Sequence, residues 1–162
     1  MPGTRSLLLF VLAAIVAQGA PPESCSVTRP PSQVFVPPPP FEAAPTEGAE
    51  YLFGSDDFWL SLPKDGIWET QHEQSRYVRT KIPWFSKSFW WRSTEKDGLT
   101  VDAKRLDGDA ETVHKVGAAS GFIPESQQSF MINSIEFPTT GCWEIRASYQ
   151  NHELKFTVWV TP

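Results

Sequence analysis

Apolar and polar side chains alternate in short runs along the chain from residue 51 onward. The alternation is clearest over residues 99–105, 142–149 and 154–160, and it recurs over 129–137. A period of two is typical of a β-strand with one buried face, because successive side chains point to opposite sides of the sheet. Turn signals rich in proline, glycine and aspartate separate the runs, and no run has helical spacing. The pattern therefore predicts an all-β domain, either an antiparallel sandwich or a barrel.

The last two runs predict a β-hairpin with residues 150–153 as a four-residue loop. This register places Trp143 opposite Val160 and Glu144 opposite Trp159. One face of the hairpin is then entirely apolar and is expected to face the core. The other face is expected to carry Cys142, Glu144, Arg146, Thr157 and Trp159.

Two proline-containing segments predict further strand features. Residues 63–66 (PKDG) have the composition of a tight turn, in which Pro presets φ and Gly66 takes a positive φ. Residues 57–71 are therefore predicted to form a hairpin around this turn. In the aromatic run 81–91, Pro83 cannot donate to a strand ladder, which predicts a bulge or an edge strand at that point.

The N-terminus has the organisation of a secretory signal peptide over residues 1–20. Arg5 is followed by ten apolar residues at 7–16 and by small residues at 17–20. Ten apolar residues are too few to span a bilayer, and the switch to proline at position 21 argues against a buried N-terminal helix. We expect an exported protein, periplasmic or secreted, without stable membrane insertion after signal cleavage. A lipid anchor on Cys25 is disfavoured because polar and small residues separate it from the apolar run.

Residues 21–48 are predicted to form a proline-rich arm, and residues 49–162 the β-sandwich domain. Prolines at 37–40 favour an extended polyproline II segment, which has no internal hydrogen bonds. If the arm is tied to the domain through Cys25, it must fold back along the domain, and we expect it to cover Trp159. The alternative is that Trp159 is an exposed platform for a ligand.

Cys25 and Cys142 are the only cysteines. In an oxidising compartment two cysteines without a third usually pair, so a Cys25–Cys142 disulfide is predicted. The alternative is a catalytic thiolate at Cys142, which needs a histidine nearby to lower its pKa. The three histidines, at positions 72, 114 and 152, are scattered and lie in no recognisable motif.

Composition restricts the possible functions without naming one. The chain has 162 residues, which suit one domain, and its formal net charge of -5 argues against nucleic-acid binding. Residues 107–111 (DGDAE) alternate like a calcium loop but lack the rest of that pattern. No metal-ligand, phosphate-binding or catalytic motif is present, so no metal, cofactor or catalytic residue is assigned.

The block FPTTGCWE at residues 137–144 resembles the C-terminal hairpin of a family of uncharacterised exported bacterial proteins. The segments WWR at 90–92, KRLD at 104–107 and CSVTRP at 25–30 fit the same family, whereas residues 117–128 match it poorly. More broadly, a corner ending in glycine before an aromatic strand resembles the E–F corner of immunoglobulin-like domains. The resemblance implies an exported immunoglobulin-like β-sandwich, with strand F at 142–149 and strand G at 154–160. It implies no activity.

Trp90, Trp91 and Arg92 form the main candidate surface. On a strand, one of two neighbouring indoles points into the core and the other outward. The outward ring, with Arg92 beside it, is suited to stack on a sugar ring or on an aromatic side chain of a partner. Glu144 and Trp159 complete the predicted ligand or partner surface. Burial of the outward rings under a loop or the arm is the alternative.

The predicted function is that of a non-catalytic binding or interaction module at the cell envelope or in the secreted fraction. The expected partner is an unidentified protein or glycan. A small hydrolase using Cys142 or a carboxylate pair is one alternative, and a structural or inhibitor-like accessory module is another. The hydrolase requires a free Cys142 near a histidine, whereas the binding module requires an exposed tryptophan cluster.

Overall fold

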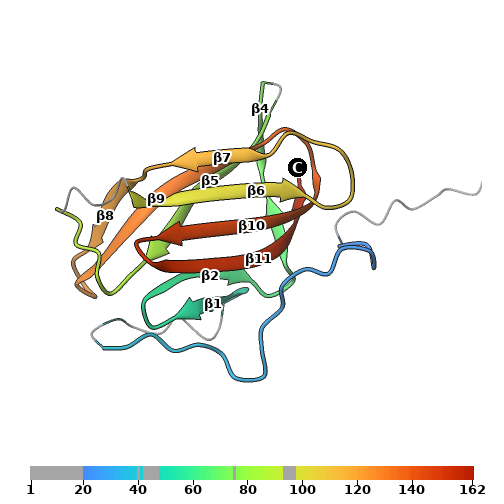
Figure 1. Ribbon diagram of the computed structural model, residues 1–162. Helices are drawn as coiled ribbons and strands as arrows, with labels where there is room; N and C mark the ends of the chain where they lie inside the picture. The colour runs from blue at the N-terminus through green and yellow to red at the C-terminus, as the bar shows by residue number, and fades with distance from the viewer. Residues whose placement is uncertain (1–19, 40, 42–47, 75, 93–97) are drawn as a thin grey trace, which may run out of the picture.

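The computed structural model describes residues 20–39, 41, 48–74, 76–92 and 98–162. The predicted signal peptide therefore lies outside the described residues, apart from Ala20. The described residues form eleven strands in two packed sheets (Figure 1). This arrangement confirms the prediction of an all-β sandwich.

The first sheet has the strand order β1-β2-β5-β9-β8, with β4 paired to β5, and the second has the order β3-β11-β10-β6-β7. The strands of the first sheet are β1 Glu50–Ser55, β2 Phe58–Pro63, β4 Gln71–Glu73, β5 Arg76–Phe85, β8 Ala119–Ile123 and β9 Gln128–Phe137. Those of the second are β3 Ile67–Glu69, β6 Thr100–Arg105, β7 Val113–Val116, β10 Gly141–Tyr149 and β11 His152–Thr161.

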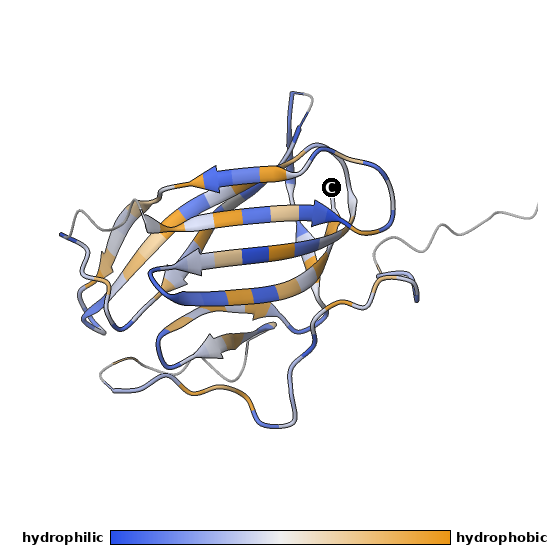
Figure 2. Cartoon of the chain, viewed as in Figure 1, coloured by the Kyte–Doolittle hydropathy of each residue, from blue (hydrophilic) through white to orange (hydrophobic). Residues whose placement is uncertain are grey.

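Aromatic rings from the two sheets meet in the core. Phe137 of β9 lies 5.1 Å from Trp143 of β10 between ring centroids, and Trp84 of β5 lies 6.3 Å from Phe156 of β11. All four side chains are buried. On the second sheet the colours along β6, β10 and β11 alternate between hydrophilic and hydrophobic, as expected when one face is buried and the other is not (Figure 2). The sequence alternation thus marks the core faces correctly.

The register of the C-terminal hairpin differs from the predicted one by two residues. Tyr149 pairs with His152, so the turn contains only Gln150 and Asn151. Gln150 takes a φ of 53°, which allows this tighter turn and matches the strand twist better than a longer loop does. The prediction that Glu144 faces Trp159 is therefore wrong. A shift of two leaves the faces unchanged, and Trp159 lies opposite Cys142 instead.

The predicted hairpin over 57–71 is also wrong, although its turn is confirmed. Gly66 has a φ of 68° and donates its N–H to the Pro63 carbonyl at 3.0 Å. After this turn the chain crosses to the other sheet, where β3 pairs in parallel with β11, while β2 pairs with β1. The bulge near Pro83 is present as a register shift between Arg79 and Ile82 in β5, which lies inside the sheet rather than at its edge.

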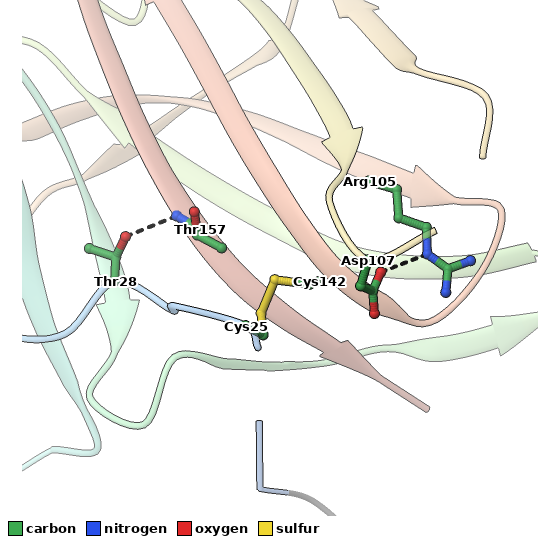
Figure 3. Close-up of a disulfide and its surroundings, with 6 residues drawn as sticks. All are labelled: Cys25, Thr28, Arg105, Asp107, Cys142 and Thr157. Carbon is green, nitrogen blue, oxygen red and sulfur yellow. Dashed lines mark hydrogen bonds and ion pairs between the residues drawn. A yellow bond between two sulfur atoms is a disulfide. The ribbon is translucent and has the colours of Figure 1, made fainter. Parts of the chain in front are cut away.

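The disulfide between Cys25 and Cys142 ties the arm to the start of β10 (Figure 3). Three residues further along the arm, the Thr28 N–H donates to the Thr157 carbonyl at 2.8 Å, and the Thr157 N–H donates to Thr28 Oγ1 at 2.9 Å. These bonds cover part of the outer edge of β11, which protects it from pairing with another chain. The disulfide prediction is confirmed, and the alternative of a free Cys142 nucleophile is wrong.

The arm packs against Trp59, a tryptophan that the sequence did not single out. The rings of Phe35 and Phe41 lie 5.8 and 4.8 Å from that of Trp59, which is only 2% exposed. In Figure 1 the arm leaves the edge of β11 and runs on beside β1 and β2, which explains why its rings reach Trp59. Trp159 is half-buried beside the disulfide-bonded Cys142, and its backbone N–H donates to the Gly66 carbonyl at 2.9 Å.

An ion pair holds the corner that precedes β10. Arg105 Nε donates to Asp107 Oδ1 at 2.8 Å (Figure 3). Arg105 Nη1 also donates to Thr139 Oγ1 at 3.0 Å. Gly141 closes the corner with a φ of 137°, and a Cβ there would lie 2.9 Å from Asp107 Oδ1. Partial burial works against the charge of Asp107, but the Arg105 guanidinium and the Cys142 N–H outweigh it and lower the pKa of this carboxyl.

Asp107→Asn is expected to destabilise the protein by about 1 kcal/mol at pH 7, since it removes one partly buried ion pair. The folded-state pKa of Asp107 lies below the ordinary value of 3.8, so the ion pair stabilises the fold above that value. Its contribution is lost as the pH falls through the lowered pKa. Urea unfolding should therefore give a lower free energy of unfolding for the variant than for the wild type at pH 7, and this difference should vanish as the pH is lowered from about 4. A difference that is independent of pH would contradict this assignment.

Candidate functional site

Trp90, Trp91 and Arg92 lie in the loop that follows β5 and not on a strand, in contrast to the sequence prediction. Strand β5 ends at Phe85, and the two indoles are therefore not forced to opposite faces of a sheet. Trp90 is 51% exposed, whereas Trp91 is half-buried and packs against the core. The loop thus presents one indole to solvent and uses the other as its support.

Phe122 of β8 completes this group, which we call the Trp90 surface: Trp90, Trp91, Arg92 and Phe122. The Phe122 ring is stacked with Trp91 at 5.7 Å and an interplanar angle of 23°, and it meets Trp90 edge-on at 6.0 Å. The Arg92 guanidinium lies over the Trp91 ring, 4.6 Å from its centroid. A cation over an indole is attracted by the ring quadrupole, so Arg92 is held against the surface.

The loop that carries Trp90 is anchored at several points. Phe89 is 4% exposed and meets Tyr149 edge-on at 6.1 Å. Ser88 Oγ donates to Gln150 Oε1 at 2.9 Å in the turn between β10 and β11. Lys87 forms an ion pair with Asp57 in the turn between β1 and β2. These contacts tie the loop to two neighbouring turns, and a site held in this way loses little entropy on binding.

Charge at this end of the sandwich is locally balanced. The hydrogen bond from Lys87 lowers the pKa of Asp57, slight desolvation opposes it, and the charges of Lys87 and His152 add to the lowering. His152 Nδ1 lies 3.9 Å from Asp57 Oδ2. The Asp57 carboxylate therefore stays ionised and serves as an anchor for Lys87.

Glu144 and Trp159, the other two predicted surface residues, lie elsewhere. Trp159 pairs with Cys142 at the start of β10, whereas the Trp90 loop contacts the turn after Tyr149. Seven strand residues separate these points, which corresponds to roughly 23 Å. Glu144 belongs to a charged face, where the hydrogen bond from Lys155 at 2.8 Å lowers its pKa against slight desolvation. The structure therefore does not bring the five predicted surface residues together.

Comparison with protein-family models, with curated proteins and with solved structures finds no match for this chain. The family resemblance of the FPTTGCWE block therefore stays a prediction. The Trp90 surface and its surroundings are the basis on which a function can be inferred.

The described part of the chain holds no cluster of metal-ligating side chains. No group of three or more His, Cys, Asp or Glu side chains lies close enough there to hold a metal ion. Ser88, His152 and Asp57 come from neighbouring turns, but Ser88 is bonded to Gln150 and Ser86. Within the described residues of the chain, no helix is long and apolar enough to cross a membrane.

Phe122 is the member of the surface that sequence reasoning missed. It belongs to β8, within the segment 117–128 that fits the family resemblance poorly. Its strand pairs with β9, where Gly121 faces Phe130. A Cβ on Gly121 would lie 2.2 Å from the Phe130 ring, so this glycine allows the ring to lie over the strand. The apolar pair at 122–123 after that glycine was the available strand signal.

Proposed function

We propose that this protein is an exported, non-catalytic binding module that holds a partner through the Trp90 surface. The observation that carries the proposal is an indole that is 51% exposed on a loop anchored by Lys87, Ser88 and Phe89. A large aromatic side chain left in water gains free energy when a partner covers it. A loop that is already ordered loses little entropy on binding, and rigid aromatic anchors dominate the affinity of many interfaces.

We also propose that the sandwich is immunoglobulin-like. The order β2-β5-β9-β8 corresponds to strands A-B-E-D, and β11-β10-β6-β7 corresponds to G-F-C-C′. In this correspondence β10 and β11 are strands F and G, and the Trp90 loop belongs to the B–C connection, beside the F–G turn. Immunoglobulin variable domains bind their ligands with loops of that end, which supports a binding role by analogy of fold alone. The departure is that Cys142 pairs with the arm and not with strand B.

Export to an oxidising compartment is part of the same proposal. The Cys25–Cys142 disulfide and the signal-like residues 1–20 support it, since disulfides persist mainly outside reducing compartments. The partner is accordingly expected at the cell envelope or in the surrounding medium. No cofactor enters the proposal.

Replacing Trp90 with alanine is expected to weaken binding to envelope material by tenfold or more, because the exposed indole is removed. Oxidised protein is incubated with envelope material from the source cells, pelleted, and the bound fraction measured over a concentration series. Val36→Ala is the matched control, since Val36 is 67% exposed but lies on the arm. Val36→Ala should leave the unfolding midpoint nearly unchanged, whereas Trp90→Ala also loses ring contacts and should lower it slightly.

Binding that is equal for wild type and Trp90→Ala, or that depends on Val36 instead, would remove the Trp90 surface from the proposal. A dependence on Trp90 with no dependence on Val36 would support it. Circular dichroism of each variant establishes that the sandwich is intact before the comparison is made.

A further inference from the structure

On an anchored loop, the exposed ring of Trp90 contacts Trp91, and the guanidinium of Arg92 lies over the same Trp91 ring. We propose that this pair binds the pyranose ring of a glycan, with the sugar stacked on the Trp90 indole and its hydroxyl or carboxylate oxygens bonded to Arg92. This inference rests on the proposed binding function and names the ligand class for the same surface. The site would contact one sugar ring of a longer glycan.

Trp90 is the platform of the surface because Trp91 is already occupied. Trp91 stacks with Phe122 at 5.7 Å and carries the Arg92 guanidinium 4.6 Å above its ring. Trp90 touches Trp91 and Phe122 at 6.3 and 6.0 Å in tilted and edge-on arrangements, which leave half of its area exposed. The carbon-bound hydrogens of a pyranose form an apolar, electropositive face, and this face is attracted to the electron-rich face of an indole.

Arg92 provides the polar half of the site. A guanidinium presents five N–H donors in one plane, and stacking on an indole leaves that plane's edge available. Within the described residues Arg92 makes no hydrogen bond or ion pair, and its interaction there is with the Trp91 ring. A sugar that lies on Trp90 carries oxygens around its rim, which these donors can bond in a bidentate manner.

The size of the patch favours a sugar over a protein. A stable protein–protein contact buries about 800 Å² on each partner around an apolar centre. Trp90, 51% exposed, is the large exposed hydrophobic side chain of the Trp90 surface, and Ile123, 36% exposed, follows Phe122 on β8. The others belong to different parts of the fold: Val34 and Val36 on the arm, Leu106 after β6, and Val116 on β7. One exposed indole matches a sugar ring better than it matches such an interface.

The decisive experiment separates sugar stacking from apolar contact at the same position. Trp90→Phe keeps an aromatic face and should bind envelope material within about fivefold of wild type, whereas Trp90→Leu keeps only apolar area and should bind at least tenfold more weakly. Arg92→Ala should also lose binding severalfold. Each protein is titrated, oxidised, against three samples of the envelope material: untreated, protease-treated, and treated with periodate, which cleaves the vicinal diols of sugars.

Binding that survives protease, is abolished by periodate and follows the order wild type, Phe, Leu supports the glycan. Binding that is abolished by protease and survives periodate overturns the glycan but leaves the proposed binding function standing. Equal binding of Trp90→Leu and wild type overturns the stacking geometry. If wild type and Trp90→Ala bind untreated material equally, the proposed function itself fails, and this outcome is distinct from the other two.

Discussion

Replacing both Cys25 and Cys142 with serine is expected to lower the free energy of unfolding by about 4–5 kcal/mol. The two cysteines are 117 positions apart, so the disulfide closes a loop that includes most of the chain. In the chain-entropy account, a cross-link across so long a loop removes many conformations from the unfolded state. Guanidinium unfolding of the wild type and the double variant under oxidising conditions measures the difference.

The same double variant is expected to loosen the arm. Without the disulfide the arm is held by Thr28 on Thr157 and by Phe35 and Phe41 on Trp59, so chymotrypsin should cleave after Phe35 faster. Thr28→Val serves as the control, because it removes one hydrogen bond of 2.9 Å, worth about 1 kcal/mol, and leaves the disulfide in place. A double variant with the unfolding midpoint of the wild type would show that the disulfide does not stabilise the fold.

Truncation of Trp84 to alanine is expected to lower the free energy of unfolding by about 3–5 kcal/mol. This effect is comparable to the loss of the disulfide. Trp84 is 0% exposed, lies in β5 between Phe58 and Phe156, and leaves a large cavity when its ring is removed. Its indole N–H also donates to Asn133 Oδ1 at 2.8 Å in the buried interior. Loss of this donor leaves a buried acceptor without its partner, which adds to the cost of the cavity.

A double-mutant cycle separates the two contributions of Trp84. Trp84→Phe keeps an aromatic ring but removes the donor, so it should cost about 1–3 kcal/mol. Combination of this change with Asn133→Leu should cost less than the sum of the single changes, because donor and acceptor disappear together. Additive effects would mean that the bond between Trp84 and Asn133 contributes nothing, and the cost of Trp84→Ala would then be packing alone.

The Trp90 surface combines residues that are adjacent in the chain with one from a distant strand, and the sequence therefore predicted only part of it. Trp90, Trp91 and Arg92 are adjacent in the chain and could be recognised as a group. Phe122 comes from β8, about thirty positions later, and joins them only through the pairing of β8 with β9. Glu144 and Trp159 were assigned to the same surface from their strand faces, but the length of β10 separates them from it.

Several features were determined by the sequence alone. Alternation over 142–149 and 154–160 identifies the buried face of β10 and β11, because the period of a strand does not depend on its partner. Gly66 marks its turn, because only its own backbone has to take the positive φ. Two cysteines without a third predict their own pairing, and this pairing is present.

Other features were decided only by the tertiary structure. The two-residue turn at 150–151 set the register of the C-terminal hairpin, and the parallel pairing of β3 with β11 sent residues 67–69 to the other sheet. Phe41 of the arm packs against Trp59, which is buried, whereas Trp90 is exposed. These outcomes depend on which segments distant in sequence meet in space, and an indole has the same local sequence signal whether a distant ring covers it or solvent does.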